Sequence, residues 1–115
     1  MLDTIKSGTE ISILFKEGKR YSSSCATLLA KHGEEEHGPR GRVAFIAGKK
    51  LGNAVWRNRA KRRLRAVVKD IGGPWQGFDM VFIAKSTLTQ TEYSKVCRQC
   101  SSMVEKALKD QAQGQ

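Results

Sequence analysis

The sequence lacks the features that several classes of protein require. Its longest unbroken apolar runs, residues 43–47 and 80–84, are much too short to span a bilayer. The first ten residues, MLDTIKSGTE, contain neither an apolar core nor a cleavage pattern, so we expect no signal peptide. Three cysteines without framework spacing do not predict disulfides and favour a reducing compartment. We therefore expect a soluble, cytoplasmic protein that contacts no membrane.

Catalytic and metal-binding patterns are also missing. No Ser-His-Asp, Cys-His or paired-carboxylate arrangement stands out, so we predict no catalytic residue. Cys97 and Cys100 have redox or zinc spacing, but without a second ligand pair they are better interpreted as small buried residues of a helix. His32 and His37 flank three acids, which we interpret as part of a loop rather than a metal site. We expect no cofactor or metal bound by the protein itself.

Acidic residues are absent from the centre of the chain. The net charge is +10, from 21 Lys and Arg against 11 Asp and Glu, and no acid occurs between Glu36 and Asp70. An uncompensated basic segment indicates a polyanionic partner, most simply a nucleic acid. The excess of Arg favours a structured nucleic acid, because Arg binds phosphate bidentately and stacks on bases. The basic residues of this segment are Lys49, Lys50, Arg57, Arg59, Lys61, Arg62, Arg63, Arg65 and Lys69.

The same segment has the period of an amphipathic helix. Asn53 is a good N-cap, and no helix breaker follows until Gly72. No Glu is spaced to pair with the basic residues, and such like charges destabilise a free helix, so a binding surface is favoured over a solvated face. A membrane-surface helix is disfavoured because a small core needs the apolar face. That face contains Trp56, Ala60, Leu64, Val67, Val68 and Ile71.

The N-terminal half contains a short helix and two extended segments. Residues 7–10 form a capping-box pattern, and the helix they open should end at Gly18. Residues 21–30 predict a strand or bent strand pair in which Cys25, Thr27 and Leu29 share a face. Residues 32–40 predict a loop, and residues 42–47 a second, largely apolar strand.

The C-terminal half adds one strand and one helix. Residues 78–84 predict a strand, and residues 89–92 form a capping-box pattern that opens a helix. We expect the tail to fray from about residue 110. The element order predicts one α+β domain over residues 1–115, a two-layer α/β sandwich of three helices on a small sheet. The apolar face of the last helix contains Tyr93, Val96, Cys100, Met103, Val104 and Ala107.

Residues 49–65, KKLGNAVWRNRAKRRLR, match a family signature. They resemble the pattern KK-x-G-N-A-V-x-R-N-R-x-K-R, followed by a further Arg, of the bacterial ribonuclease P protein subunit. Phe15, Gly18, Arg42 and residues 78–85 agree with the flanking positions. The resemblance therefore covers roughly residues 7–108.

The resemblance implies a subunit of the endoribonuclease that removes the 5′ leader from precursor tRNA. In this family the RNA subunit, with bound magnesium, performs the cleavage, and we expect one protein per RNA. The resemblance further implies a mostly four-stranded mixed sheet and a left-handed βαβ crossover containing the basic helix. It places nine residues on the face toward the ribonuclease P RNA: Lys49, Lys50, Asn53, Arg57, Asn58, Arg59, Lys61, Arg62 and Arg65. We add Arg63 to this face because it is basic here, although family members vary at its position.

The resemblance also implies a cleft for the single-stranded leader between the first helix and the sheet, containing Ile11, Phe15 and Leu29. Here the sequence departs from the family: Ile11 stands where an aromatic residue is common, Leu29 where Tyr is frequent, and Ser23-Ser24 replaces an Asn-Arg pair. Because stacking on an aromatic side chain contributes about 1–3 kcal/mol per base, we expect this protein to bind the leader more weakly than family members with those aromatic residues. The alternatives are a general structured-RNA-binding or ribosomal-type protein without a role in cleavage, and a DNA-binding protein.

Overall fold

The computed structural model describes residues 8–32 and 41–113. The four strands form one sheet in the order β1-β2-β4-β3. The β1–β2 and β2–β4 pairs are antiparallel, whereas β3 and β4 are parallel and connected through α2. The α+β class, the three helices and the mixed four-stranded sheet are thus confirmed. The elements are α1 (Gly8–Glu17), β1 (Lys19–Ser22), β2 (Ala26–His32), β3 (Arg42–Ile46), the 3-10 helix η2 (Lys49–Leu51), α2 (Ala54–Asp70), β4 (Phe78–Ala84), the 3-10 helix η3 (Ser86–Thr89) and α3 (Tyr93–Gln113).

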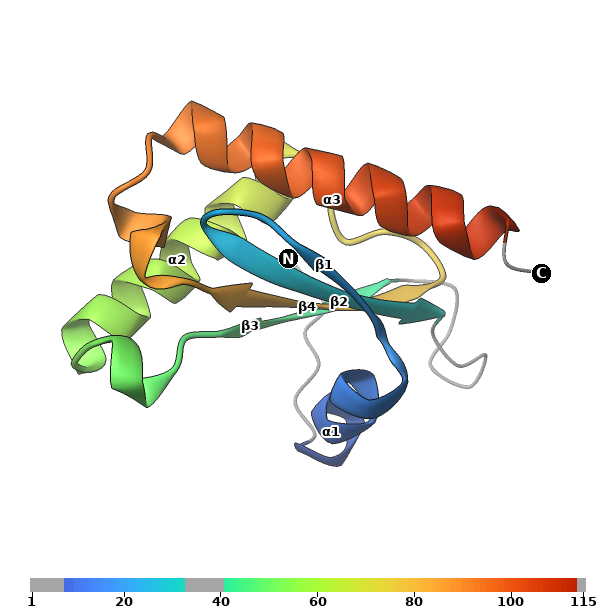
Figure 1. The fold of residues 1–115 in the computed structure, drawn as a ribbon, viewed down its shortest axis with the longest axis horizontal. Helices are drawn as coiled ribbons and strands as arrows, with labels where there is room; N and C mark the ends of the chain where they lie inside the picture. The colour runs from blue at the N-terminus through green and yellow to red at the C-terminus, as the bar shows by residue number, and fades with distance from the viewer. Residues whose placement is uncertain (1–7, 33–40, 114–115) are drawn as a thin grey trace.

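Helices cover both faces of the sheet, α2 and α3 on one and α1 on the other (Figure 1). The alternation of strand residues explains this arrangement. In β4, Met80 and Phe82 belong to the larger apolar core with α2 and α3, whereas Val81 packs with Leu14 of α1 and Leu29 of β2. α1 therefore adds a partial third layer to the predicted two-layer sandwich.

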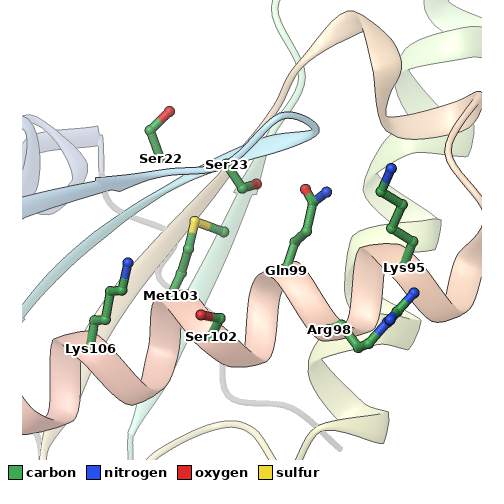
Figure 2. Close-up of a pocket in the computed structure, with 8 residues that line it drawn as sticks. All are labelled: Ser22, Ser23, Lys95, Arg98, Gln99, Ser102, Met103 and Lys106. Carbon is green, nitrogen blue, oxygen red and sulfur yellow. The ribbon is translucent and has the colours of Figure 1, made fainter.

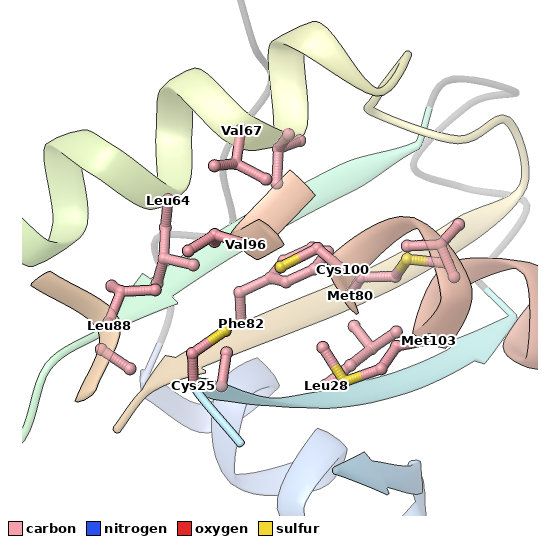
Figure 3. Close-up of a cluster of buried hydrophobic side chains, with 14 of the residues drawn as sticks. Cys25, Leu28, Leu64, Val67, Met80, Phe82, Leu88, Val96, Cys100 and Met103 are labelled. Carbon is pink, nitrogen blue, oxygen red and sulfur yellow. The ribbon is translucent and has the colours of Figure 1, made fainter. Parts of the chain in front are cut away.

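The apolar face of α2 packs into the larger core as its periodicity predicts. Leu64, Val67 and Val68 have no exposed surface, and Leu64 and Val67 point toward the cluster around Phe82 (Figure 3). The helix stops before Gly72, whose φ of 103° lies in the region that favours glycine.

The segment predicted as one strand or a bent pair is a tight hairpin of β1 and β2. Ser23 makes the turn, since its Oγ donates to the carbonyl oxygen of Ala26 at 3.0 Å and accepts from the Ala26 amide at 3.2 Å. Such local side-chain bonds compete with an extended ladder. The face predicted for Cys25 was wrong. Cys25 precedes β2 and packs with Leu28 in the larger core, whereas Leu29 packs in the smaller cluster under α1.

The ends of α3 differ from the predicted ones. Residues 86–89 form η3 and α3 begins at Tyr93, so the capping box predicted at residues 89–92 is wrong. The hydroxyl of Thr89 instead accepts a hydrogen bond from Trp56 Nε1 at 3.0 Å. At the other end the helix continues to Gln113, and Asp110 is held by Tyr21 and Lys19 rather than frayed. The loop predicted at residues 32–40 is wrong at His32, which ends β2, and residues 33–40 lie outside what the structure describes. Ser7, the N-cap of the capping box predicted at residues 7–10, lies outside it as well.

Because one face of α2 is buried and the other exposed, substitutions on the two faces should affect the free energy of unfolding differently. Leu64→Ala should lower the free energy of unfolding by about 2–5 kcal/mol, because it removes a buried side chain and leaves a cavity. Arg62→Ala, on the outer face of the same helix, is the control and should change it by less than about 0.5 kcal/mol. Urea unfolding followed by circular dichroism measures both variants. Equal effects of the two substitutions would contradict the packing of α2.

Candidate nucleic-acid interface

Most of the predicted RNA-face residues lie on open surface. Lys49 and Lys50 project from η2, which lies with the start of α2 at one end of the molecule (Figure 1). None of the ion pairs found among residues 8–32 and 41–113 uses a basic residue of η2 or α2. The positive charge of this surface is thus not neutralised by those residues. Its exposed members are Lys49, Lys50, Asn53, Asn58, Arg59, Arg62 and Arg65.

The start of α2 is held by three contacts around Trp56. Asn53 caps the helix by accepting a hydrogen bond from the Trp56 amide at 2.9 Å, as predicted. The Trp56 ring is anchored through its bond to Thr89. A Cβ atom at Gly52 would lie 3.0 Å from Trp56 side-chain carbons, so a larger residue would crowd the ring. Asn53 therefore caps the basic helix, Gly52 leaves room for the Trp56 ring, and the Trp56–Thr89 bond fixes the start of the helix on the core.

Arg63 belongs to the scaffold rather than to the open surface. Its guanidinium lies 5.5 Å from the centroid of the Tyr93 ring, and its Nη2 donates to the carbonyl oxygen of Thr91. Tyr93 in turn donates to Asp70 at 2.5 Å, and this hydrogen bond, with burial, raises the pKa of the Tyr93 hydroxyl. Arg63 thus joins the side of α2 to the start of α3, a role that the sequence pattern did not indicate.

The opposite flank of α2 rests on β3. The Arg65 guanidinium lies 5.5 Å from the centroid of the Phe45 ring, so this side chain is partly oriented while it stays exposed. Arg57 and Lys61 are half-buried. Arg57 Nε is buried without a hydrogen-bond partner among the described residues, which leaves a donor available to an incoming acceptor if the side chain shifts.

The three residues predicted for a leader cleft differ in accessibility. Phe15 is 47% exposed on α1, whereas Leu29 is only 1% exposed and packs beneath the helix with Leu14. Ile11 is half-buried against the same cluster. Of the three, Phe15 offers the surface on which a base could stack, and Leu29 supports α1 from below.

Sequence reasoning missed two residues beside α1. Ile46 and Ile83 are half-buried neighbours in the β3–β4 register and pack against the cluster under α1. They follow the alternation of the strands: Ile83 lies two residues after Val81, and Ile46 two residues after Ala44. That period-two pattern was the signal that could have identified them.

Other candidate chemistry is not assembled in the part of the chain that the structure describes. There, no group of three or more His, Cys, Asp or Glu side chains is placed to hold a metal ion. Burial, with smaller effects of Cys25 and Cys97, raises the pKa of the Cys100 thiol to about 12, so it stays protonated at neutral pH. The rings of His32 and Phe78 stack with their centroids 4.8 Å apart, whereas His37 lies outside the described residues. Within the described residues, no helix is long and apolar enough to cross a membrane.

Comparisons with known proteins agree on one family. A family model for ribonuclease P matches residues 2–108. The ribonuclease P protein component of Natranaerobius thermophilus is 31% identical over 106 residues, which cover 90% of this chain and 89% of that protein. The corresponding protein of Streptococcus pyogenes is 30% identical over 92 residues, covering 80% and 75% of the two chains.

Solved structures show the same fold. The RNase P protein of Staphylococcus aureus superimposes with a TM-score of 0.77 at 20% identity, covering 93% of this chain and 96% of that one. The RNase P protein of Thermotoga maritima gives a TM-score of 0.74 at 21% identity, with coverages of 90% and 96%. At these identities the structural likeness supports only the arrangement of helices and sheet. The assignment to a family rests on the sequence matches.

The two roles of adjacent arginines predict different effects on stability. Arg63→Met should lower the free energy of unfolding by roughly 1–2 kcal/mol, because it removes a cation–π contact and a hydrogen bond. Arg62→Met, one residue away on the outer face, should change the free energy of unfolding by less than about 0.5 kcal/mol from the wild-type value. Chemical denaturation of both variants tests this difference, and a neutral Arg63→Met would show that Arg63 is not part of the scaffold.

Proposed function

The chain belongs to the ribonuclease P protein family, and from this premise we propose that η2 and α2 bind the catalytic RNA while the α1 side holds the 5′ leader of precursor tRNA. The protein is accordingly an RNA-binding subunit of an endoribonuclease that acts in tRNA processing. The observation that carries the proposal is the exposed basic surface of α2, which lies opposite the buried side chains of Ala60, Leu64, Val67 and Val68 on the same helix.

The chemistry of α2 suits a folded RNA backbone. Arg59 and Arg62 are exposed and can each bind a phosphate through two hydrogen bonds. The exposed amide of Asn58 can donate to and accept from a 2′-hydroxyl or a base edge. Since α2 is packed on the sheet, the backbone that carries these groups is held in place before the RNA arrives, which lowers the entropy cost of binding.

We assign the cleavage chemistry to the RNA subunit and its magnesium ions, as the family resemblance implies. The part left to the protein is electrostatic and geometric. Its positive surface offsets the repulsion between two RNA backbones, one from the catalytic RNA and one from the substrate. This role predicts that the protein matters most when magnesium is scarce, because fewer cations are then available to screen the phosphates.

On the α1 side, the proposal rests mainly on Phe15. Its exposed ring can stack on one leader base, and Ile46 and Ile83 provide apolar surface on the neighbouring sheet face. Leu29 contributes by supporting α1. One protein per RNA and a cytoplasmic location complete the proposal, the latter supported by three cysteines that are all free. The alternative of a structured-RNA-binding protein without a role in cleavage gains no support from the relatives found.

Reconstitution tests this proposal directly. At low magnesium, adding the protein to the cognate RNA subunit should increase leader cleavage of precursor tRNA over RNA alone. Arg59→Gln/Arg62→Gln should weaken RNA binding and reduce the slope of log K against log salt by about 0.7–0.9 for each phosphate that the variant no longer neutralises. Lys16→Gln/Arg20→Gln removes the same charge from exposed positions outside α2 and should leave the slope for the RNA subunit unchanged. The absence of any stimulation by the wild-type protein would refute the function.

Phe15→Ala tests the leader contact separately. It should raise the KM for precursor tRNA with a long leader by about 5- to 150-fold, the equivalent of the 1–3 kcal/mol that stacking on one base contributes. Binding of mature tRNA, which has no leader, should not change. Ser12→Ala, another exposed position of α1, is the control. Equal effects on substrates with and without a leader would rule out a stacking role for Phe15.

A further inference from the structure

A second positively charged hollow lies away from α2 and α1. It is a groove of about 360 Å³ between the β1–β2 turn and α3. Lys95, Gln99 and Lys106 project from α3 to the side on which Ser22 and Ser23 lie (Figure 2). Because the sheet order is β1-β2-β4-β3, this groove lies near the β1 edge, whereas α2 packs over β3 and β4. The two basic surfaces therefore lie toward opposite edges of the sheet.

The groove contains one sign of charge. Lys95, Arg98 and Lys106 line it together with three serines, Gln99 and Met103, and none of these described lining residues is acidic. The three cations, with Ser102 between Arg98 and Lys106, recur every three or four residues and so follow one line along α3. From residue 95 to residue 106 this line is about 16 Å long at 1.5 Å per residue. None of the ion pairs among the described residues involves these three cations.

The wall opposite the cations is fixed by hydrogen bonds. The Gln99 amide exchanges bonds of 2.9 and 3.1 Å with the Ser24 hydroxyl, and its oxygen also accepts from Cys25 Sγ at 3.0 Å. Lys85 donates to the Ser22 hydroxyl at 2.8 Å and to the carbonyl oxygen of Ser23. The β1–β2 turn is therefore tied to both α3 and the end of β4, and the groove keeps its shape without a ligand.

We propose that this groove binds the phosphate backbone of an RNA strand, as a second RNA contact separate from α2 and from the α1 side. Lysine and arginine side chains neutralise phosphates, and the hydroxyls of Ser22 and Ser102 can donate further hydrogen bonds. Among the described residues that line the groove there is no aromatic side chain to stack on a base, so the contact is independent of sequence.

A solvated charged face explains the groove less well than an RNA strand does. Solvated helices intersperse acids with cations at i, i+4 positions. Lys106 follows this pattern, since Asp110 lies four residues later, but Lys95 and Arg98 have the uncharged Gln99 and Ser102 at that spacing. The groove itself concentrates cations and hydroxyls against a fixed wall. With contacts at both edges of the sheet, the protein can hold two RNA segments at once, and binding of the second gains from a raised effective concentration.

The test measures binding of a uridine 12-mer to the full chain as a function of salt. Lys95→Gln/Arg98→Gln/Lys106→Gln should reduce the slope of log K against log salt by about 2, since each neutralised phosphate of a single strand contributes about 0.7. Lys95→Arg/Arg98→Lys/Lys106→Arg keeps the charge at the same positions and should behave as wild type. All three substituted positions lie on the surface of α3, and a thermal melt verifies that each variant folds.

An unchanged slope in the glutamine variant would overturn the proposal. Arg59→Gln/Arg62→Gln is measured in the same assay. If it lowers the slope while the groove variant does not, RNA binding by the groove is refuted and RNA binding by α2 is supported. Parallel titration with polyglutamate of equal length identifies the other possible class of ligand. Loss of polyglutamate binding alone, with RNA binding intact, would assign the groove to an acidic protein partner and would also overturn the proposal.

Discussion

Burial of the apolar side of α2 is the interaction on which the rest of the structure depends. Full burial of Leu64, Val67 and Val68 stabilises the fold by roughly 5–9 kcal/mol, at about 1.5–3 kcal/mol for each side chain. Like-charge repulsion costs only about 0.2–0.5 kcal/mol per pair, and the helix contains six such pairs at three- or four-residue spacing. Burial therefore outweighs repulsion. The pairs are Arg57–Lys61, Arg59–Arg62, Arg59–Arg63, Lys61–Arg65, Arg62–Arg65 and Arg65–Lys69.

This balance connects stability to function. A helix with so much unpaired charge is held by the core instead of by ion pairs, so its cations stay available to phosphate. Trp56 and Arg63 fix the helix at its start and on one side, and both reach residues just before or at the start of α3. The same C-terminal region forms one wall of the groove at the other edge of the sheet. The small sheet thus holds its two basic helices, α2 and α3, in a fixed relation to each other.

Periodicity predicted the helices, the third and fourth strands and the two-faced character of α2, because burial imposes a fixed spacing on the residues involved. Side-chain contacts between distant segments could not be predicted in this way. Ser23 turns the chain through its own bonds to Ala26, and Thr89 is used by Trp56 instead of capping a helix. Arg63 looks like any other basic residue in the pattern, and only its position over Tyr93 separates it from the exposed Arg62.

The central claim is that RNA covers the outer face of η2 and α2. Lysine acetylation of the protein, free and bound to the ribonuclease P RNA, measures this most directly when read by mass spectrometry. Lys49 and Lys50 are exposed in the free protein, and we predict that the RNA protects both strongly, whereas Lys16 on α1 remains reactive. Unchanged reactivity of Lys49 and Lys50 in a saturated complex would contradict the claim.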